Sequence, residues 1–174
     1  MRIERGFTLI ELIVVIAVLA ILVTTAVPGF NRFVAHERRV STVMSLVHAL
    51  NLARSRAISS GRYVAVCPSV DSRTCAGDES QWDAGWLVFI NLDPESPPEI
   101  DEGERVLLRH GPVEDVLEVT ANREGFNFRP RSIRSTAGSL FVCTRNHHNE
   151  AIIISYTGRV RTSARYDGEP VACD

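Results

Sequence analysis

Residues 6–27 read GFTLIELIVVIAVLAILVTTAV, an almost unbroken apolar run that follows a short segment carrying Arg2 and Arg5. From Phe7 to Val27 the run has 21 residues. As a helix it would span about 31 Å, close to the roughly 30 Å hydrocarbon core of a bilayer. The two arginines predict that the N-terminus stays in the cytoplasm and that the remainder is exported. The run therefore predicts a single-pass membrane anchor.

Glu11 is the one carboxylate inside this run. An acid at the bilayer centre costs roughly 2.5 to 3.5 kcal/mol, less near an end, and such residues usually have a partner. A cleaved secretory signal peptide is the competing interpretation, with residues 24–27 as a small-residue cleavage site. The glutamate argues against it, because a signal peptide has no use for a buried acid. A membrane anchor with an incidental glutamate is the other alternative.

The run Gly6-Phe7-Thr8-Leu9-Ile10-Glu11 resembles the processing site of type IV pilins and type II secretion pseudopilins. The resemblance implies that a prepilin peptidase removes residues 1–6 as a leader, cutting between Gly6 and Phe7, and methylates the new amine of Phe7. It also implies a partner for Glu11, the Phe7 amine of a neighbouring subunit in the low-dielectric filament core. The expected location is the bacterial inner membrane, with the exported part in the periplasm and other pilin or pseudopilin subunits as partners.

Helical spacing continues beyond the anchor, so we predict one pilin helix over residues 7–61. Its first part, 7–27, is the transmembrane and filament-core segment, and its second part, 28–61, is amphipathic. The apolar stripe comprises Phe30, Phe33, Val34, Val40, Val43, Met44, Val47, Leu50, Ala53 and Ala57. Gly61 is a suitable C-cap. The predicted solvent side carries Arg38, Arg39, Arg54 and Arg56.

From Arg62 onward the pattern alternates, with short β-branched and aromatic runs between Gly, Pro, Asn and Asp residues. Residues 62–174 therefore predict an exported β-rich domain, and the chain as a whole an α+β fold. The predicted strands are Tyr63–Cys67, Trp86–Asn91, Val106–Arg109, Leu117–Ala121, Phe126–Arg129, Ser139–Thr144, Ala151–Ser155 and Arg159–Thr162.

Several pieces of this domain resemble the minor pseudopilins of the GspH and FimT family. The pieces are Cys67-Pro68-Ser69, Trp82-Asp83-Ala84-Gly85-Trp86-Leu87-Val88-Phe89, Gly125-Phe126-Asn127-Phe128 and residues 152–161. The resemblance implies a long helix packed on two small antiparallel sheets. Trp82, Trp86 and Phe89 are then expected in the core rather than in a ligand cage.

The four cysteines, Cys67, Cys75, Cys143 and Cys173, all follow the apolar segment, and their even number suits an oxidising compartment. Their spacing does not fit a zinc site. Four cysteines allow three connectivities, and free thiols are the alternative. We expect Cys67–Cys75, which closes a short loop, and Cys143–Cys173, which ties the C-terminal tail to a strand.

Charge is sorted along the exported domain although the whole chain has a net charge of only -2. Residues 71–118 hold thirteen acids and three arginines, a net -10, whereas residues 119–166 hold eight arginines and two acids, a net +6. A domain sorted in this way can attract a polyanion to its basic part.

Gly158-Arg159-Val160-Arg161 lies in the basic part and resembles the DNA-binding element of FimT-type minor pilins, which serve natural transformation. On a strand, Arg159 and Arg161 share a face about 6.7 Å apart while Val160 packs inward, and paired guanidinium groups suit phosphate oxygens. We predict sequence-independent binding of double-stranded DNA here, with lesser contributions from Arg165, Arg145, Arg131 and Arg134. Only Tyr156 and Tyr166 are nearby aromatics, so contacts to the DNA backbone are expected. A solvated hairpin whose arginines pair with local acids is the alternative.

Two other groups of residues, a histidine pair and an acidic loop, do not predict a metal site. Adjacent His147 and His148 would face opposite sides of a strand, and the acidic loop over residues 93–104 lacks calcium-ligand spacing. We expect no enzyme activity, no catalytic residue, no metal and no cofactor. Two functions remain. One is a DNA-binding minor pilin of a type IV pilus, and the other is a structural tip subunit of a type II secretion pseudopilus or a type IV pilus.

Overall fold

The computed structural model describes residues 8–113, 117–130, 135–144 and 149–171, with side chains left out at positions 25, 28, 31 and 32. In chain order the elements are α1 (Leu9–Ser60), β1 (Tyr63–Pro68), η1 (Trp82–Ala84), β2 (Trp86–Asn91), β3 (Arg105–His110), β4 (Leu117–Ala121), β5 (Phe126–Phe128), β6 (Gly138–Thr144), β7 (Glu150–Ile154), β8 (Val160–Ser163), β9 (Arg165–Tyr166) and β10 (Glu169–Pro170). The chain forms two compact units, which divide within α1 after Glu37.

Local hydrogen bonds explain where α1 begins and ends. Thr8 Oγ1 accepts the Glu11 amide at 3.4 Å, and Glu11 Oε2 accepts the Thr8 amide at 2.9 Å and its hydroxyl at 2.8 Å. This reciprocal arrangement is a capping box. At the other end the Gly61 amide donates to Ala57 O at 3.2 Å with φ +68°, as a glycine C-cap does. The predicted helix is therefore confirmed to within two residues at each end.

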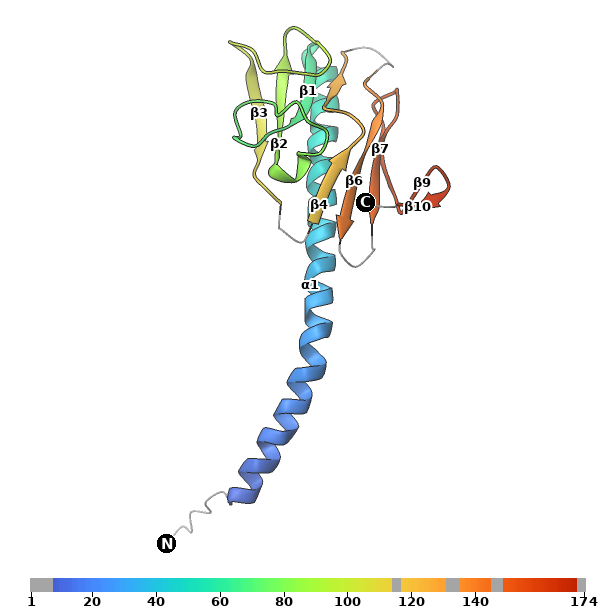
Figure 1. Ribbon diagram of the computed structural model, residues 1–174. Helices are drawn as coiled ribbons and strands as arrows, with labels where there is room; N and C mark the ends of the chain where they lie inside the picture. The colour runs from blue at the N-terminus through green and yellow to red at the C-terminus, as the bar shows by residue number, and fades with distance from the viewer. Residues whose placement is uncertain (1–7, 114–116, 131–134, 145–148, 172–174) are drawn as a thin grey trace. The chain divides into compact units, whose positions relative to one another are not determined.

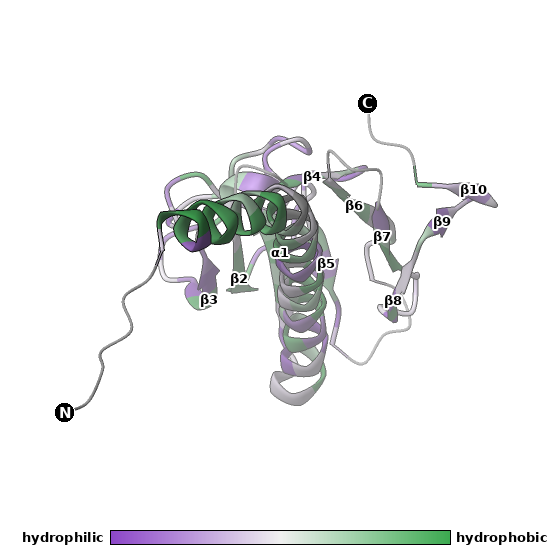
Figure 2. Cartoon of the chain, turned by 90° about the horizontal axis from the view of Figure 1, so that it is seen from below, coloured by the Kyte–Doolittle hydropathy of each residue, from purple (hydrophilic) through white to green (hydrophobic). Residues whose placement is uncertain are grey.

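The first unit is an apolar stretch of helix whose described side chains between Thr8 and Phe30 form no buried core of their own. Each side chain described between Thr8 and Phe30 is exposed, and Figure 2 shows the early turns of α1 as strongly hydrophobic. Within the described residues, no helix has both the length and the apolar character that a membrane crossing requires.

The second unit is built around the last turns of α1. Six of its apolar residues are buried along one face of the helix, at helical spacing: Val43, Leu46, Ala49, Leu50, Ala53 and Ala57. The predicted apolar stripe was wrong at Met44, which is 67% exposed, and at Phe30 and Phe33 of the first unit, which are 66% and 60% exposed. Met44 lies about 100° around the helix from Val43, on the side of the stripe that faces away from the core.

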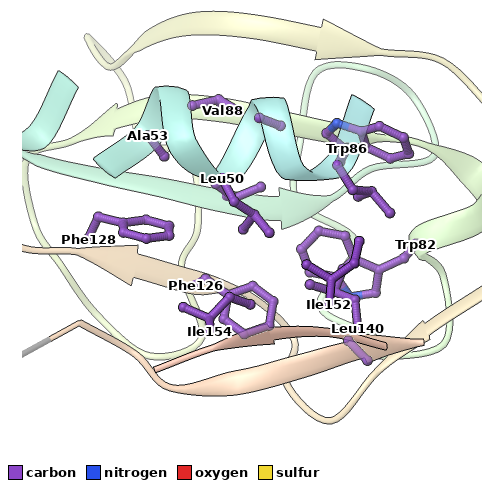
Figure 3. Packing of buried hydrophobic residues seen from close by; sticks show 14 of the residues in the cluster. Leu50, Ala53, Trp82, Trp86, Val88, Phe126, Phe128, Leu140, Ile152 and Ile154 are labelled. Carbon is purple, nitrogen blue, oxygen red and sulfur yellow. The ribbon is translucent and has the colours of Figure 1, made fainter. Parts of the chain in front are cut away.

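The strands form two antiparallel sheets and one short ribbon, which confirms the predicted α+β fold (Figure 1). One sheet has the order β3-β2-β1-β5, the other β4-β6-β7-β8, and β9 pairs with β10. Both sheets and α1 contribute to one hydrophobic core, as Figure 3 shows for Leu50, Trp86, Phe126 and Ile154. The predicted burial of Trp82, Trp86 and Phe89 is confirmed.

The opposite face of the first sheet has a smaller core of its own, formed by Ala65, Cys67, Leu87 and Phe89. Cys75 packs against it and is bonded to Cys67, so the predicted Cys67–Cys75 disulfide is confirmed. Since β1 carries apolar residues toward both cores, it is buried almost throughout.

Candidate functional site

The β7–β8 hairpin carries the predicted DNA-binding element. Ile153 pairs with Arg161 and Ile154 with Val160. Val160 is half-buried and packs on the main core, whereas Arg159 and Arg161 are exposed. The predicted alternation is thus present. The predicted strand boundary was one residue early, because β8 begins at Val160 and Arg159 ends the turn.

Backbone hydrogen bonds fix the turn between the two strands. The Ser155 carbonyl accepts a hydrogen bond from the Gly158 amide at 2.8 Å, and the Ser155 amide donates to Arg159 O at 3.1 Å. The Ser155 hydroxyl accepts the Arg159 amide at 3.2 Å. Gly158 has φ +69°, a conformation that residues with a Cβ rarely adopt. Arg159 is therefore held at a turn whose backbone groups are already paired.

The arginines of this hairpin are available to an external anion. Within the part of the chain that the structure describes, Arg159, Arg161 and Arg165 have no carboxylate partner within ion-pair distance. Arg161 and Arg165 line a groove of about 420 Å³ together with Tyr166 and Asp167. This arrangement does not match the alternative in which the arginines pair with local acids.

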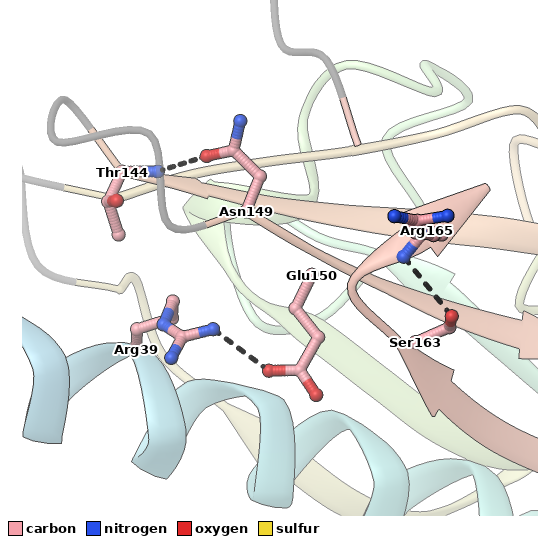
Figure 4. A network of polar contacts seen from close by, with 6 residues as sticks. All are labelled: Arg39, Thr144, Asn149, Glu150, Ser163 and Arg165. Carbon is pink, nitrogen blue, oxygen red and sulfur yellow. Dashed lines mark hydrogen bonds and ion pairs between the residues drawn. The ribbon is translucent and has the colours of Figure 1, made fainter. Parts of the chain in front are cut away.

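Arg165 and its neighbours follow directly on β8. Its amide donates to Ser163 Oγ at 3.1 Å (Figure 4), which shapes the corner between β8 and β9. The Tyr166 ring lies edge-on against Phe141 of β6, with centroids 5.0 Å apart. The β9–β10 ribbon was missed by the sequence prediction, because two-residue strands carry no periodic signal.

An ion pair joins the basic hairpin to α1. The Arg39 guanidinium donates to Glu150 Oε2 on β7 at 3.0 Å, and the two side chains are only 13% and 22% exposed (Figure 4). The prediction that Arg39 marks the solvent side of α1 was therefore wrong. Nothing in the sequence pairs residues 39 and 150, because their proximity arises only when the second sheet packs on the helix.

The acidic part of the domain contains a carboxylate fixed by its own loop. Asp71 Oδ1 accepts the amides of Thr74 and Arg73, each at 2.8 Å, and Asp71 Oδ2 accepts the Thr74 hydroxyl at 3.0 Å. Hydrogen bonds to the charged form, led by the Thr74 amide, lower the pKa of Asp71 to about 2. The Ser80 amide lowers the pKa of Asp78 in the same way. Both carboxylates are therefore ionised at neutral pH.

Several predicted residues lie outside the described residues, namely Gly6, Phe7, Arg131, Arg134, Arg145, His147, His148 and Cys173. Cys143 is disulfide-bonded, and Cys173 remains its predicted partner. Glu11 is described, and its carboxylate is satisfied by Thr8 of the same chain. In the single chain, the Glu11 carboxylate therefore has a hydrogen-bond partner even without the amine of a neighbouring subunit.

Comparison with known proteins identifies two matching segments. The family described as type II transport protein GspH matches residues 42–158, and the prokaryotic N-terminal methylation motif matches residues 1–27. The first covers the last part of the amphipathic helix, from residue 42, and most of the β-rich unit, and the second covers the apolar run.

Among curated relatives, a fimbrial protein of Pseudomonas aeruginosa is 33% identical over 99% of this chain and 98% of its own length. The type II secretion system protein H of Escherichia coli is 30% identical over 68% of this chain and 82% of its own length. The type IV major fimbrial protein FimA of Dichelobacter nodosus is 30% identical over 53% of this chain, which spans about half (54%) of that relative.

Two solved structures show the same fold. The type IV minor pilin FimU of Pseudomonas aeruginosa aligns with a TM-score of 0.55 at 18% identity, covering 75% of this chain and 92% of that chain. The minor pseudopilin EpsH of Vibrio cholerae aligns with a TM-score of 0.50 at 13% identity, covering 72% and 96%.

Proposed function

Because the chain belongs to the GspH family of type II transport proteins, we propose that it is a minor pilin of a type IV pilus that binds DNA for natural transformation. Membership of this family makes the chain a pilin-type subunit of a type IV pilus or a type II secretion system. The finer proposal, DNA binding, rests on the basic hairpin.

One observation supports DNA binding above the others. Arg159 ends the hydrogen-bonded turn and Arg161 lies on β8; both are exposed, and no acid among the described residues lies within ion-pair distance of either. Arg165 of β9 lines the same groove as Arg161. Exposed guanidinium groups on a fixed backbone can donate to phosphate oxygens without first breaking an internal ion pair. Binding through phosphates would be independent of base sequence and would weaken as salt is added.

The N-terminal segment supports insertion into a filament. In this proposal, prepilin peptidase cuts between Gly6 and Phe7, methylates Phe7, and leaves residues 7–27 as anchor in the inner membrane with the domain in the periplasm. The match to the methylation motif and the exposed apolar side chains of the first unit support this step. On assembly, Glu11 would exchange its contact with Thr8 for the Phe7 amine of a neighbouring subunit.

A titration of the detergent-solubilised full-length chain with a fluorescent DNA duplex tests the proposal. Arg159→Gln combined with Arg161→Gln should weaken binding and reduce the slope of log K against log salt by about 2, roughly one for each lost phosphate contact. The matched control is Arg105→Gln combined with Arg109→Gln, which removes the same charge from exposed positions on β3.

The control variant should bind the duplex like the wild type. Unchanged affinity and salt slope in the Arg159 and Arg161 variant would exclude this site. An equal loss in both double variants would instead indicate a response to net charge. A transformation assay with the same two variants links binding to DNA uptake.

A structural tip subunit without DNA binding is the second candidate. The relationship to the type II secretion protein H of Escherichia coli favours it. In that case the exposed hairpin would contact other minor subunits, and neither double variant would change DNA affinity. Co-purification of neighbouring subunits with the wild type, lost in the Arg159 and Arg161 variant, would support this candidate.

A further inference from the structure

A second groove, of about 570 Å³, adjoins the same β7–β8 turn. Its lining combines Tyr63 of β1, Asn127 of β5, the segment after β5, and the turn itself, and comprises Tyr63, Pro94, Ser96, Asn127, Arg129, Ser135, Thr136 and Tyr156. Its volume lies within the range of ordinary ligand sites. Tyr156 is two residues before Gly158, so the groove and the arginine element share one turn.

Tyr156 is the unusual residue of this lining, because its side chain is 73% exposed. Its only described polar contact is through the backbone, where its carbonyl accepts the Ser135 amide at 2.7 Å. The phenol ring therefore contributes little to the stability of the fold, and replacing Tyr156 with alanine should leave the fold intact. A large aromatic ring left exposed beside a groove is typical of a stacking platform.

The groove also holds free donors for an anion. The Arg129 guanidinium lies 5.9 Å from the centre of the Tyr63 ring, a cation–π distance that positions it while leaving its N–H groups available. Among the residues that the structure describes, Arg129 has no carboxylate partner and the Ser135 hydroxyl has no hydrogen-bond partner. A phosphate oxygen can accept from both.

Asn127, the buried amide side chain in the lining, is held by internal hydrogen bonds. Asn127 Oδ1 accepts from Asn91 at 3.3 Å, and Asn127 Nδ2 donates to Glu95 O at 2.7 Å. Because Asn127 is only 8% exposed and its amide is held by these two bonds, it is poorly placed to recognise the edge of a base. A ring bound in this groove would be held by stacking and by its phosphate, without selection of base identity.

We propose that this groove binds an unpaired nucleotide of single-stranded DNA, with the base on Tyr156 and a phosphate on Arg129 and Ser135. The inference rests on the proposed function, since the adjoining phosphates would follow Arg159 and Arg161. It refines the ligand, because bases inside a duplex are stacked on one another and cannot reach a ring in a groove. The chain would bind duplex DNA by the arginines alone and single-stranded DNA by the arginines and the groove.

The test compares a fluorescein-labelled oligothymidylate with a duplex of equal phosphate count, each titrated with the full-length chain in detergent. Tyr156→Ala should weaken oligothymidylate binding about fivefold or more, the lower end of the loss expected from one stacked base, and change duplex binding less than about twofold. Tyr156→Phe keeps the ring and should bind like the wild type. Photocrosslinking of a 5-iodouracil oligonucleotide should label Tyr156, located by mass spectrometry.

The outcomes separate this inference from the proposed function. Equal loss for both DNAs in Tyr156→Ala, no loss for either, or a crosslink confined to other residues would overturn the groove and leave the arginine site intact. Duplex binding without oligothymidylate binding would do the same. If the wild type binds neither DNA, both proposals fail. If the Arg159 and Arg161 variant binds both DNAs normally while Tyr156→Ala loses the oligothymidylate, the arginine site fails and the groove stands.

Discussion

Gly158→Ala should destabilise the β-rich unit more than the same substitution at a glycine that has the same backbone conformation but empty space where the Cβ would lie. Gly158 has φ +69°, and a Cβ placed there would lie 2.8 Å from Ser135 Oγ and 3.3 Å from Phe128 Cδ1. The first distance is shorter than real Cβ contacts allow, and Phe128 is buried in the core, so it cannot move away freely.

The magnitude has two parts. Placing alanine in the left-handed conformation costs about 1–2 kcal/mol. Crowding a packed site typically adds about 1–3 kcal/mol. Gly61 isolates the first part, because it has φ +68° and nothing within 4 Å of a built Cβ. We therefore expect Gly61→Ala to cost about 1–2 kcal/mol and Gly158→Ala about 2–5 kcal/mol.

Urea unfolding of the full-length chain in detergent provides the measurement. Trp82 and Trp86 are fully buried, so their fluorescence reports on the core of the β-rich unit. Ser135→Ala removes the nearest atom, and combining it with Gly158→Ala should recover about 1 kcal/mol of the loss. Equal destabilisation by Gly158→Ala and Gly61→Ala, or no recovery in the double variant, would refute the crowding argument.

Two further predictions concern charged groups. Because the folded pKa of Asp71 is lowered to about 2 from 3.8, its contribution to stability is complete above pH 3.8 and disappears as the pH falls to about 2. The urea midpoint of Asp71→Asn should lack that portion of the acid dependence, and an identical pH profile would contradict this. Arg39→Leu leaves the half-buried Glu150 carboxylate without its ion pair and should cost about 1–3 kcal/mol, whereas Arg56→Leu at an exposed position should stay within about 0.5 kcal/mol. Similar unfolding midpoints for the two leucine variants would disprove the importance of the Arg39–Glu150 pair.

The sequence predicted the fold well because each element carries a local signal. Helical spacing located α1 to within two residues at each end, and the alternating runs located the strands of both sheets, with the boundaries of β2 and β4 matching fully. The errors occurred where the local signal was weak. Met44 lies beside the apolar stripe, and the short strands β9 and β10 have no period to detect.

The candidate site was only partly predictable. A contiguous motif pointed to Arg159 and Arg161, because their spacing and charge are properties of four adjacent residues. The groove beside them was not predicted, since Tyr63 and Arg129 are far from Tyr156 along the chain. The structure brings them together because β1 pairs with β5, and the segment that follows β5 donates to the turn after β7.

The apolar run with its glutamate, the amphipathic helix, the alternating strands and the sorted charge are all determined by the sequence itself. Each is set by residues close together in the chain, where hydrophobic periodicity and charge are directly readable. Three features are decided only by the tertiary structure. Arg39 pairs with Glu150, and the arginines of the hairpin have no acidic partner among the described residues. Tyr156 lines a groove. These features depend on which surfaces pack together, and packing joins residues that no local pattern connects.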